Sequence, residues 1–248
     1  MNLKLLFCLA AGLTVLPAPA ARSQALQTDS VLAQARLSAT AVYLEAVGLE
    51  SQIYNGTEYI NYDMPHITGH QFFLTNKEMP AEIRYAGAGY SQVPLLYDLH
   101  RDQLVLTHPT SALKLKLIND KVTSFTLGGH AFIRLHKDSL AAGPGKTGFY
   151  QVLVNGKVQA LAKRYKDLQE AATREGMTGE FRDINRYFLL QDHTLIPVKS
   201  KGDVYKALPE RRKELQQYAR DQKLKFGRNR EADLVAIIRH YNGLTATP

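Results

Sequence analysis

Short strand-like runs separated by tight-turn signals fill the middle of this chain, from residue 51 to 198. Asn and Gly tolerate the positive φ that two-residue hairpin turns require, so pairs of these residues predict hairpins. Such pairs occur at Asn55-Gly56, Gly128-Gly129 and Asn155-Gly156, and Gln191–Thr194 can form a fourth turn. Closely spaced β units favour an antiparallel meander over βαβ repeats. The predicted fold class is therefore α+β, built on a curved antiparallel β meander of hairpins.

Alternating hydropathy predicts where several strands lie. Leu113, Leu115 and Leu117 alternate with lysines, which is typical of a strand with one buried and one wet face. The polar segment near 164–180 is permissive for a helix, so we expect a helical excursion between two hairpins there. Further strand candidates are Ile83–Tyr85, Val93–Tyr97 and Leu104–Thr107.

Helical patterns flank this β region, residues 51–198, on both sides. The Ala-rich residues 26–50 predict an N-terminal helical segment, and residues 199–244 predict a basic C-terminal helical segment. In the latter, Asp203 can cap a short helix, and Pro209 suits the first turn of a longer one because that position needs no N–H. A final helix has its apolar residues at helical spacing: Leu234, Ile237, Ile238 and Tyr241. We expect the segments at both ends to pack on the sheet.

The N-terminal residues 1–20 have the layout of a secretory signal peptide. Lys4 precedes the apolar run Leu5–Leu16, and Pro17-Ala18-Pro19-Ala20 supplies small residues in an A-x-A arrangement. An apolar run of about 12 residues is too short for a bilayer, which needs about 20. We expect cleavage near Ala20, with positions 21–25 as alternatives. The mature protein is then periplasmic or extracellular, and it can associate with the envelope.

The cysteine content narrows the chemistry. Cys8 is the one cysteine of the chain and lies within the predicted leader, so the mature chain is cysteine-free. Thiol catalysis, cysteine-ligated zinc and iron–sulfur clusters are thereby excluded. A mature chain of about 225 residues can bury a core without disulfides. After the leader, no apolar stretch reaches membrane-spanning length, so no transmembrane segment is predicted in the mature chain.

No catalytic, cofactor-binding or metal-ligating residue is assigned from the sequence. Asp98 and Asp102 bracket a short segment between two strands, and turn formation is the predicted role, because Asp bonds to the backbone that follows it. His66 and His70 have the spacing of a metal pair on a helix. A proline before them and a glycine between them argue against a helix, so surface or hydrogen-bonded histidines are expected.

Positive charge is concentrated at the C-terminal end. From Lys199 onward there are 12 Lys and Arg against 6 Asp and Glu, whereas the whole chain has a net charge of +8. An acidic envelope component is therefore one predicted partner and a small ligand is another, whereas nucleic acid is not expected outside the cell. Interleaved acids also fit a solvated helix face. The candidate polyanion contacts are Arg211, Arg212, Lys213 and Arg220.

Five stretches are distinctive when taken together. They are Tyr54–Tyr59, Val93–Asp98, Phe125–Phe132, Gly148–Lys157 and Leu224–Glu231. This combination resembles uncharacterised secreted proteins of Bacteroidota. The resemblance covers most of the mature chain and implies export and a one-piece architecture. It implies no activity and no catalytic residue.

These patterns favour a non-enzymatic envelope protein that binds a ligand or a partner. Curved antiparallel sheets often enclose ligands, and a basic helical segment can cover such a site. Two alternatives stay open. One is a secreted hydrolase that acts on glycans or peptides, with Asp, Glu or His brought together by the fold. The other is a surface or adhesion module that uses the basic helical tail.

Overall fold

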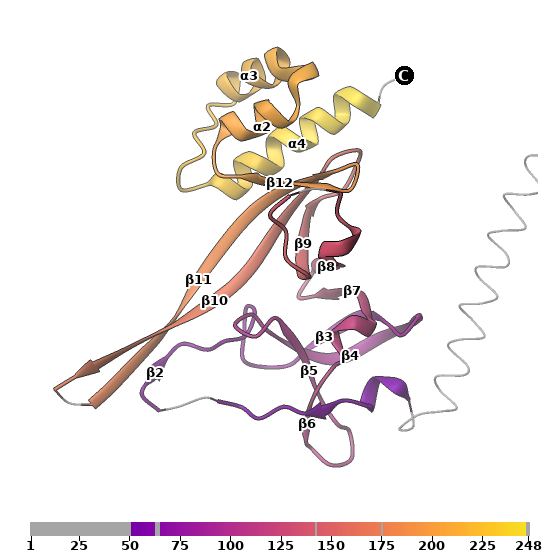
Figure 1. Ribbon diagram of the computed structural model, residues 1–248, viewed down its shortest axis with the longest axis vertical. Coiled ribbons are helices and arrows are strands. Elements are labelled where there is room, and N and C mark those ends of the chain that lie inside the picture. The colour runs from indigo at the N-terminus through magenta and orange to yellow at the C-terminus, as the bar shows by residue number, and fades with distance from the viewer. Residues whose placement is uncertain (1–50, 63–64, 142, 175, 247–248) are drawn as a thin grey trace, which may run out of the picture. The chain divides into compact units, whose positions relative to one another are not determined.

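The structure of the protein is a computed structural model. It describes residues 51–62, 65–141, 143–174 and 176–246. The predicted signal peptide and the predicted helical segment of residues 26–50 lie outside the described residues. The described part is a mostly antiparallel, open sheet of 12 strands, followed by a helical segment at the C-terminal end (Figure 1). The predictions of an antiparallel sheet and of C-terminal helices are confirmed.

The first part of the sheet has the strand order β1-β6-β5-β4-β3-β7. Its strands are β1 (Thr57–Glu58), β3 (Met79–Tyr85), β4 (Ala88–Asp98), β5 (Gln103–Thr107), β6 (Lys114–Lys116) and β7 (Val122–Leu127). After β6 the chain returns to pair β7 with the free edge of β3, where Ile83 lies opposite Phe125. The prediction of a single meander is therefore wrong. Both residues are buried. The β3–β7 pairing makes β3 an internal strand of the sheet and joins the meander β3–β6 to the meander that begins with β7.

The second part of the sheet continues from β7 in the order β8-β9-β10-β11-β12. Its strands are β8 (His130–Leu135), β9 (Gly148–Val154), β10 (Gln159–Thr173), β11 (Gly176–Gln191) and β12 (Thr194–Val198). The short β2 (Ile67–Thr68) pairs in parallel with β11, which makes the sheet mixed. Figure 1 shows β10 and β11 as a long two-stranded arm, with β2 beside its distal half.

The predicted helical excursion near 164–180 is wrong, because this segment is the distal part of the β10–β11 arm. The two strands pair without a register shift from Gln159–Leu190 to Thr173–Gly176. Helix propensity is a weak preference of a few tenths of a kcal/mol per residue, and tertiary pairing overrides it. The polar composition suits strands whose outer half is largely exposed to solvent, although Gly179 and Phe181 of β11 are buried.

Three of the four predicted turns are confirmed. Gly128 and Gly129 have φ values of 57° and 78° and join β7 to β8. Asn155-Gly156 lies between β9 and β10. Asp192 and His193 have φ values of 46° and 60° between β11 and β12, as a turn with two left-handed residues requires.

The hairpin predicted at Asn55-Gly56 is wrong. Gln52–Tyr54 forms a 3-10 helix, and the following strand β1 pairs with β6. A Cβ atom at position 56 would lie 2.3 Å from the carbonyl oxygen of Lys116. The chain at position 56 passes so close to β6 that only glycine fits there. A glycine required by close packing looks the same in the sequence as a glycine required by a turn.

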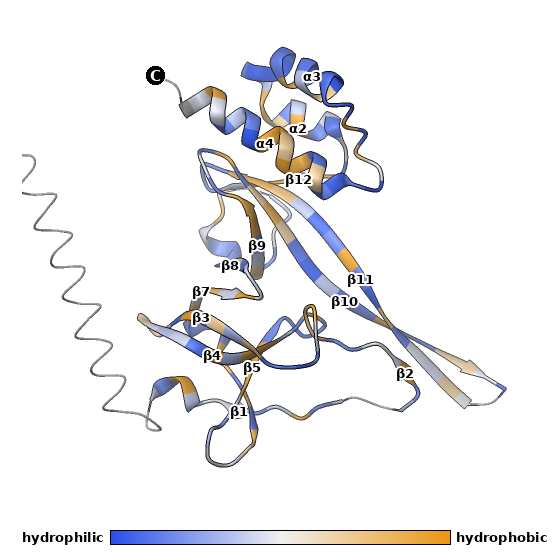
Figure 2. Cartoon of the chain, turned by 180° about the vertical axis from the view of Figure 1, so that it is seen from behind, coloured by the Kyte–Doolittle hydropathy of each residue, from blue (hydrophilic) through white to orange (hydrophobic). Residues whose placement is uncertain are grey.

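Three α-helices follow β12, and their apolar residues pack on the end of the sheet. Their bounds are Lys201–Ala207 for α2, Arg212–Asp221 for α3 and Arg230–Ala246 for α4, with a 3-10 turn at Pro209–Arg211. The N-cap of α2 is Ser200 and not Asp203, but the Asp203 carboxylate accepts a hydrogen bond from the Ser200 amide at 2.8 Å and so completes a capping box from inside the helix. The predicted apolar stripe of α4 is buried against a core that includes Val158 and Leu189 (Figure 2). Within the described residues, no helix has the length and apolarity to cross a membrane.

Candidate functional site

A groove of about 640 Å³ lies where the pairing of β11 with β12 stops. The last pair of that ladder is Tyr187 with Val198, after which the chain leaves the sheet toward α2. The groove is lined from four places: β11, the end of β12, the loop before β9 and the start of α4. The lining residues are Pro144, Asn185, Arg186, Tyr187, Phe188, Pro197, Val198, Lys199 and Arg230.

Three cations line this groove from three different elements. They are Arg186 of β11, Lys199 after β12 and Arg230 of α4. Among the described residues none of the three forms an ion pair, and no acidic side chain lines the groove. The Nε atom of Arg230 is buried and has no hydrogen-bond partner there. An unsatisfied buried donor costs about 1–3 kcal/mol, so an anion that accepts from it would recover stability.

Arg186 is held in place without losing its charge. One of its terminal nitrogens donates to the Tyr165 hydroxyl at 3.0 Å, and the guanidinium carbon lies 5.2 Å from the centroid of the same ring. A neutral aromatic partner orients a guanidinium but leaves its positive charge available. The Tyr165 contact therefore prepares Arg186 to receive an anion.

Arg230 is positioned by its neighbour Glu231. The Glu231 carboxylate accepts hydrogen bonds from Arg164 at 2.8 Å and from the Tyr187 hydroxyl at 3.0 Å. These contacts fasten the first turn of α4 to β10 and β11. Burial opposes ionisation of Glu231, but the hydrogen bond and charge of Arg164 outweigh it and hold the pKa of the carboxyl below its usual value.

Replacing Glu231 by glutamine is expected to flatten the acid side of the stability profile. A carboxyl group whose pKa is lower in the folded state stabilises the fold above its unfolded pKa, about 4.3, and this contribution is lost as the pH falls through the folded pKa. Denaturant unfolding at a series of pH values from about 5 down to 3 should therefore give a shallower slope for Glu231→Gln than for the natural protein. Glu180→Gln, which removes an exposed surface pair with Arg182, should keep the natural slope. Equal slopes for all three proteins would contradict this role.

The walls of the groove between the cations are apolar or aromatic. These lining residues are Tyr187, Phe188, Pro197 and Val198, of which Phe188 and Val198 are buried and Pro197 is exposed. The described lining residues include no Asp, Glu, His, Ser or Thr, so the groove offers positive charge and apolar surface for recognition. It suits an anionic group that carries an apolar portion.

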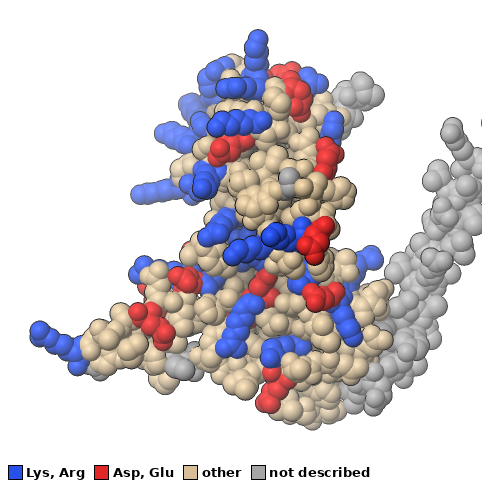
Figure 3. Space-filling model, in the orientation of Figure 1, with Lys and Arg blue, Asp and Glu red and all other residues tan. Residues whose placement is uncertain are grey.

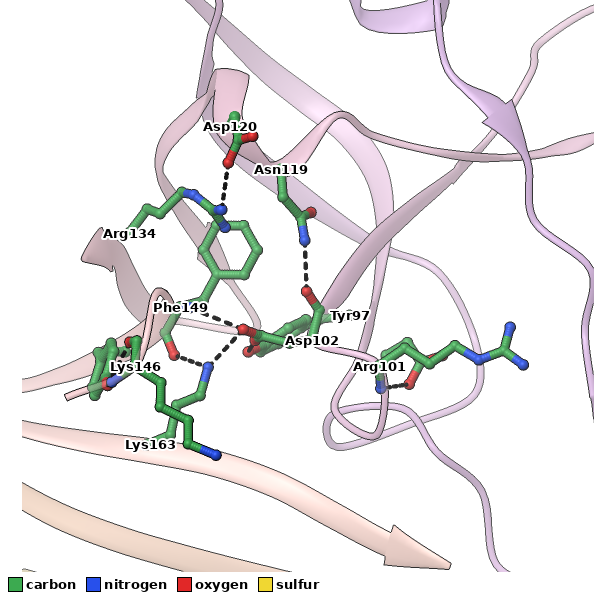
Figure 4. Close-up of polar contacts among 11 residues, drawn as sticks. Tyr97, Arg101, Asp102, Asn119, Asp120, Arg134, Lys146, Phe149 and Lys163 are labelled. Atoms are coloured by element: carbon green, nitrogen blue, oxygen red, sulfur yellow. Dashed lines mark hydrogen bonds and ion pairs between the residues drawn. The ribbon is translucent and has the colours of Figure 1, made fainter. Parts of the chain in front are cut away.

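Asp102 is the centre of a second polar cluster, which is structural (Figure 4). It lies in the turn between β4 and β5 with φ of 53°, but the described hydrogen bonds of its carboxylate go to residues outside this turn, so the predicted bond to the backbone that follows it is not shown. Its carboxylate accepts from Lys163 Nζ at 2.7 Å and from the Tyr97 hydroxyl at 2.5 Å. Lys163 donates further to the Phe149 carbonyl oxygen at 3.0 Å. The cluster joins β10, which carries the arm, to β9 and the β4–β5 turn.

Burial governs ionisation in this cluster. Desolvation lowers the pKa of Lys163, although the Asp102 charge opposes it. Desolvation and the Asp102 charge both raise the pKa of Tyr97, which therefore stays a neutral donor. The side chains of Lys163 and Asp102 are 17% and 28% exposed, so their pairing is largely shielded from water. This geometry supports a structural role, in which the Lys163 and Asp102 charges neutralise each other inside the protein.

Asp98 combines its turn role with a tether to an earlier part of the chain. One carboxylate oxygen accepts from the Arg101 amide at 2.9 Å, which is the predicted turn contact. The other accepts from the hydroxyls of Tyr59 and Tyr62 at 2.9 and 2.7 Å. Desolvation raises the pKa of both tyrosines, so they remain donors. Asp98 thus holds residues 59–62 against the sheet.

The histidine pair does not converge on a metal site. The Nε2 atom of His66 lies 3.8 Å from a Glu170 oxygen, and the His70 carbonyl oxygen accepts from Lys166 Nζ at 2.7 Å. Within residues 51–246, where described, no group of three or more His, Cys, Asp or Glu could hold a metal ion.

The four candidate polyanion contacts do not line the groove. Arg211 pairs with Glu214 at 2.9 Å, and Arg220 donates to Gln217 at 2.6 Å. Arg212 and Lys213 are exposed on α3. Figure 3 shows Lys and Arg gathered over the helical segment that holds all four. The groove instead uses Arg186, which lies in the arm and gave no sequence signal.

No protein-family model matches the chain, and no curated protein or solved structure matches it significantly. The resemblance to secreted proteins of Bacteroidota therefore stays a prediction.

Proposed function

We propose that this chain is an exported, non-enzymatic envelope protein that binds a small anionic ligand in the groove between β11, β12 and α4. The observation that carries the proposal is the set of cations Arg186, Lys199 and Arg230 around apolar walls, with no acidic residue among the described residues that line the groove. The ligand's anionic group, a phosphate or carboxylate, lies among the three cations. Its apolar portion contacts Tyr187 and Pro197.

The energetics favour recognition through few, strong contacts. Hydrogen bonds to charged groups contribute about 1.5–3 kcal/mol each, and arginine can offer two parallel donors to one anion. Because Arg186 and Lys199 are exposed, their contribution is screened by salt, whereas the buried Nε of Arg230 is screened less. Affinity should therefore fall with ionic strength, and the contribution of Arg230 should be the least sensitive to salt.

Phenyl phosphate is a suitable probe, because it joins an anion to an apolar ring. Isothermal titration calorimetry should show one site, with inorganic phosphate weaker and benzyl alcohol without binding. Arg230→Gln and Lys199→Gln should each weaken the affinity for phenyl phosphate by about tenfold, the equivalent of about 1.4 kcal/mol.

Lys213→Gln is the matched control, because it removes one exposed positive charge from α3 and leaves the groove intact. Its affinity should stay within about twofold of the natural protein, well below the tenfold steps that follow the loss of a contact. The proposal fails when phenyl phosphate shows no binding, or when Lys213→Gln weakens it as much as Arg230→Gln does.

Export rests on the N-terminal leader and has its own test. Mass spectrometry of the protein recovered from the envelope fraction should give a chain that lacks residues 1–20. A basic-tail adhesion role would use Arg211, Arg212, Lys213 and Arg220 and is separable, since none of them lines the groove. In that case Lys213→Gln would weaken envelope association without changing phenyl phosphate binding.

A further inference from the structure

In the part of the chain that the structure describes, one edge of β11 has no paired strand between its two partner strands. Tyr187–Gln191 pair with β12, and Gly179–Glu180 pair with β2 (Figure 1). The residues between them, Phe181–Arg186, pair with β10 alone in the described ladders. The gap lies directly beside the groove, whose lining includes Asn185 and Arg186.

Within Phe181–Arg186 of β11, the backbone N–H and C=O groups of alternate residues point away from β10, toward the unpaired edge. In an antiparallel pair, successive residues direct their N–H and C=O groups alternately to the two sides. The Gly179 amide donates to the His66 carbonyl oxygen at 2.9 Å, so Gly179 faces the β2 side. The β10–β11 register is uninterrupted, which places the N–H and C=O groups of Asp183 and Asn185 on the same side. These groups have no described ladder partner there.

We infer that this edge binds the C-terminal segment of a partner peptide as an added strand, with its terminal carboxylate in the groove. The inference rests on the proposed function, because the carboxylate is the anion that Arg186, Lys199 and Arg230 receive. Main-chain hydrogen bonds to an exposed strand edge and capture of a terminal carboxylate are both recurring modes of peptide recognition.

The direction of the added strand follows from β2. β2 runs parallel to β11, with Ile67 opposite Gly179 and Thr68 opposite Glu180. A peptide that extends this parallel path beside Asp183 and Asn185 reaches its C-terminal end at Arg186. An antiparallel peptide would place its N-terminal end there, and an ammonium group would face three cations. Charge complementarity therefore selects the parallel direction.

A second copy of this chain is a poor occupant of the same edge. In a two-fold antiparallel pairing centred on Ile184, Arg182 would lie opposite the Arg186 of the second copy. Like charges directly opposite destabilise a strand pair, and charged side chains are a common protection of exposed edges. The exposed arginines thus disfavour self-association and leave the edge open to a short peptide without basic side chains.

The test uses the natural protein and modified peptides, so folding of a variant is not in question. The probe is acetyl-Thr-Val-Thr-Val-Thr-Val with a free carboxyl end, titrated by calorimetry. Its C-terminal amide should bind at least about tenfold more weakly. Methylation of alternate peptide nitrogens should have an asymmetric effect: one alternate set abolishes binding because its N–H groups face β11, and the other set leaves binding unchanged.

Hydrogen exchange supplies a second readout. The amides of Asp183 and Asn185 should exchange more slowly when the peptide is bound, whereas the amide of Ile184, which faces β10, should not change. If phenyl phosphate binds but the peptide does not, or if the peptide binds with no sensitivity to N-methylation, the edge inference is overturned and the groove stands. If neither probe binds, the proposed function itself is overturned.

Discussion

Replacing Phe132 by alanine is expected to lower the free energy of unfolding by about 3–5 kcal/mol. Phe132 is 1% exposed and stacks on Phe125 with the ring centroids 4.6 Å apart. Phe73 and Tyr97 contact it edge-on, at centroid distances of 5.2 and 5.4 Å. Truncation removes the transfer free energy of the ring and leaves a cavity that these rigid neighbours cannot close. Such a loss is a large fraction of the 5–15 kcal/mol that stabilises a typical domain.

Guanidinium unfolding followed by circular dichroism measures this loss. Phe132→Leu, which keeps most of the volume, should lose clearly less and serves as the second variant if the alanine variant does not fold. Leu113→Ala is the exposed control, since Leu113 is 49% exposed, and it should change stability by less than about 0.5 kcal/mol. A loss below about 1 kcal/mol in Phe132→Ala would show that the aromatic cluster is not the packing centre of this part of the sheet.

Local patterns predicted the elements of this fold better than their connections. The turns at Gly128-Gly129 and Gln191–Thr194 follow from single-residue conformational preferences, so the sequence carries them directly. The pairing of β7 with β3 depends on contacts between distant residues such as Ile83 and Phe125, and no local pattern encodes it. The helix expected near 164–180 is wrong for the same reason, since the polar residues in this distal part of the β10–β11 arm become strands through partner pairing.

The candidate groove could not be predicted from the sequence, because its positively charged residues come from separate elements. Arg186 lies in the arm and Arg230 in the last helix, and their apposition depends on the Glu231 contacts to Arg164 and Tyr187. The basic tail drew attention to α3 because charge is visible in composition. Whether a charge is free or paired is decided by the fold, as the Arg211–Glu214 pair shows.

Replacing Asp102 by asparagine is expected to destabilise the protein by about 3 kcal/mol, because it leaves the Lys163 ammonium buried without its counter-charge. Asparagine keeps the shape of the side chain and tolerates the left-handed backbone at φ of 53°, so the variant isolates the loss of charge. Lys163→Met should lose less, since the Asp102 carboxylate retains the Tyr97 hydroxyl as a donor. Urea unfolding at pH 7 measures both losses.

The double variant Asp102→Asn/Lys163→Met should be more stable than Asp102→Asn alone. Removing both charges avoids an uncompensated ion, so the two losses are not additive and the coupling should reach about 1–3 kcal/mol. Burial lowers the pKa of Lys163, and without Asp102 to oppose it that pKa falls further. The unfolded state then binds more protons than the folded state, so the stability deficit of Asp102→Asn should shrink as the pH rises toward about 10. Two results would contradict an ion pair between Lys163 and Asp102. One is a stability deficit of Asp102→Asn that does not change with pH. The other is a double variant whose loss of unfolding free energy equals the sum of the two single losses.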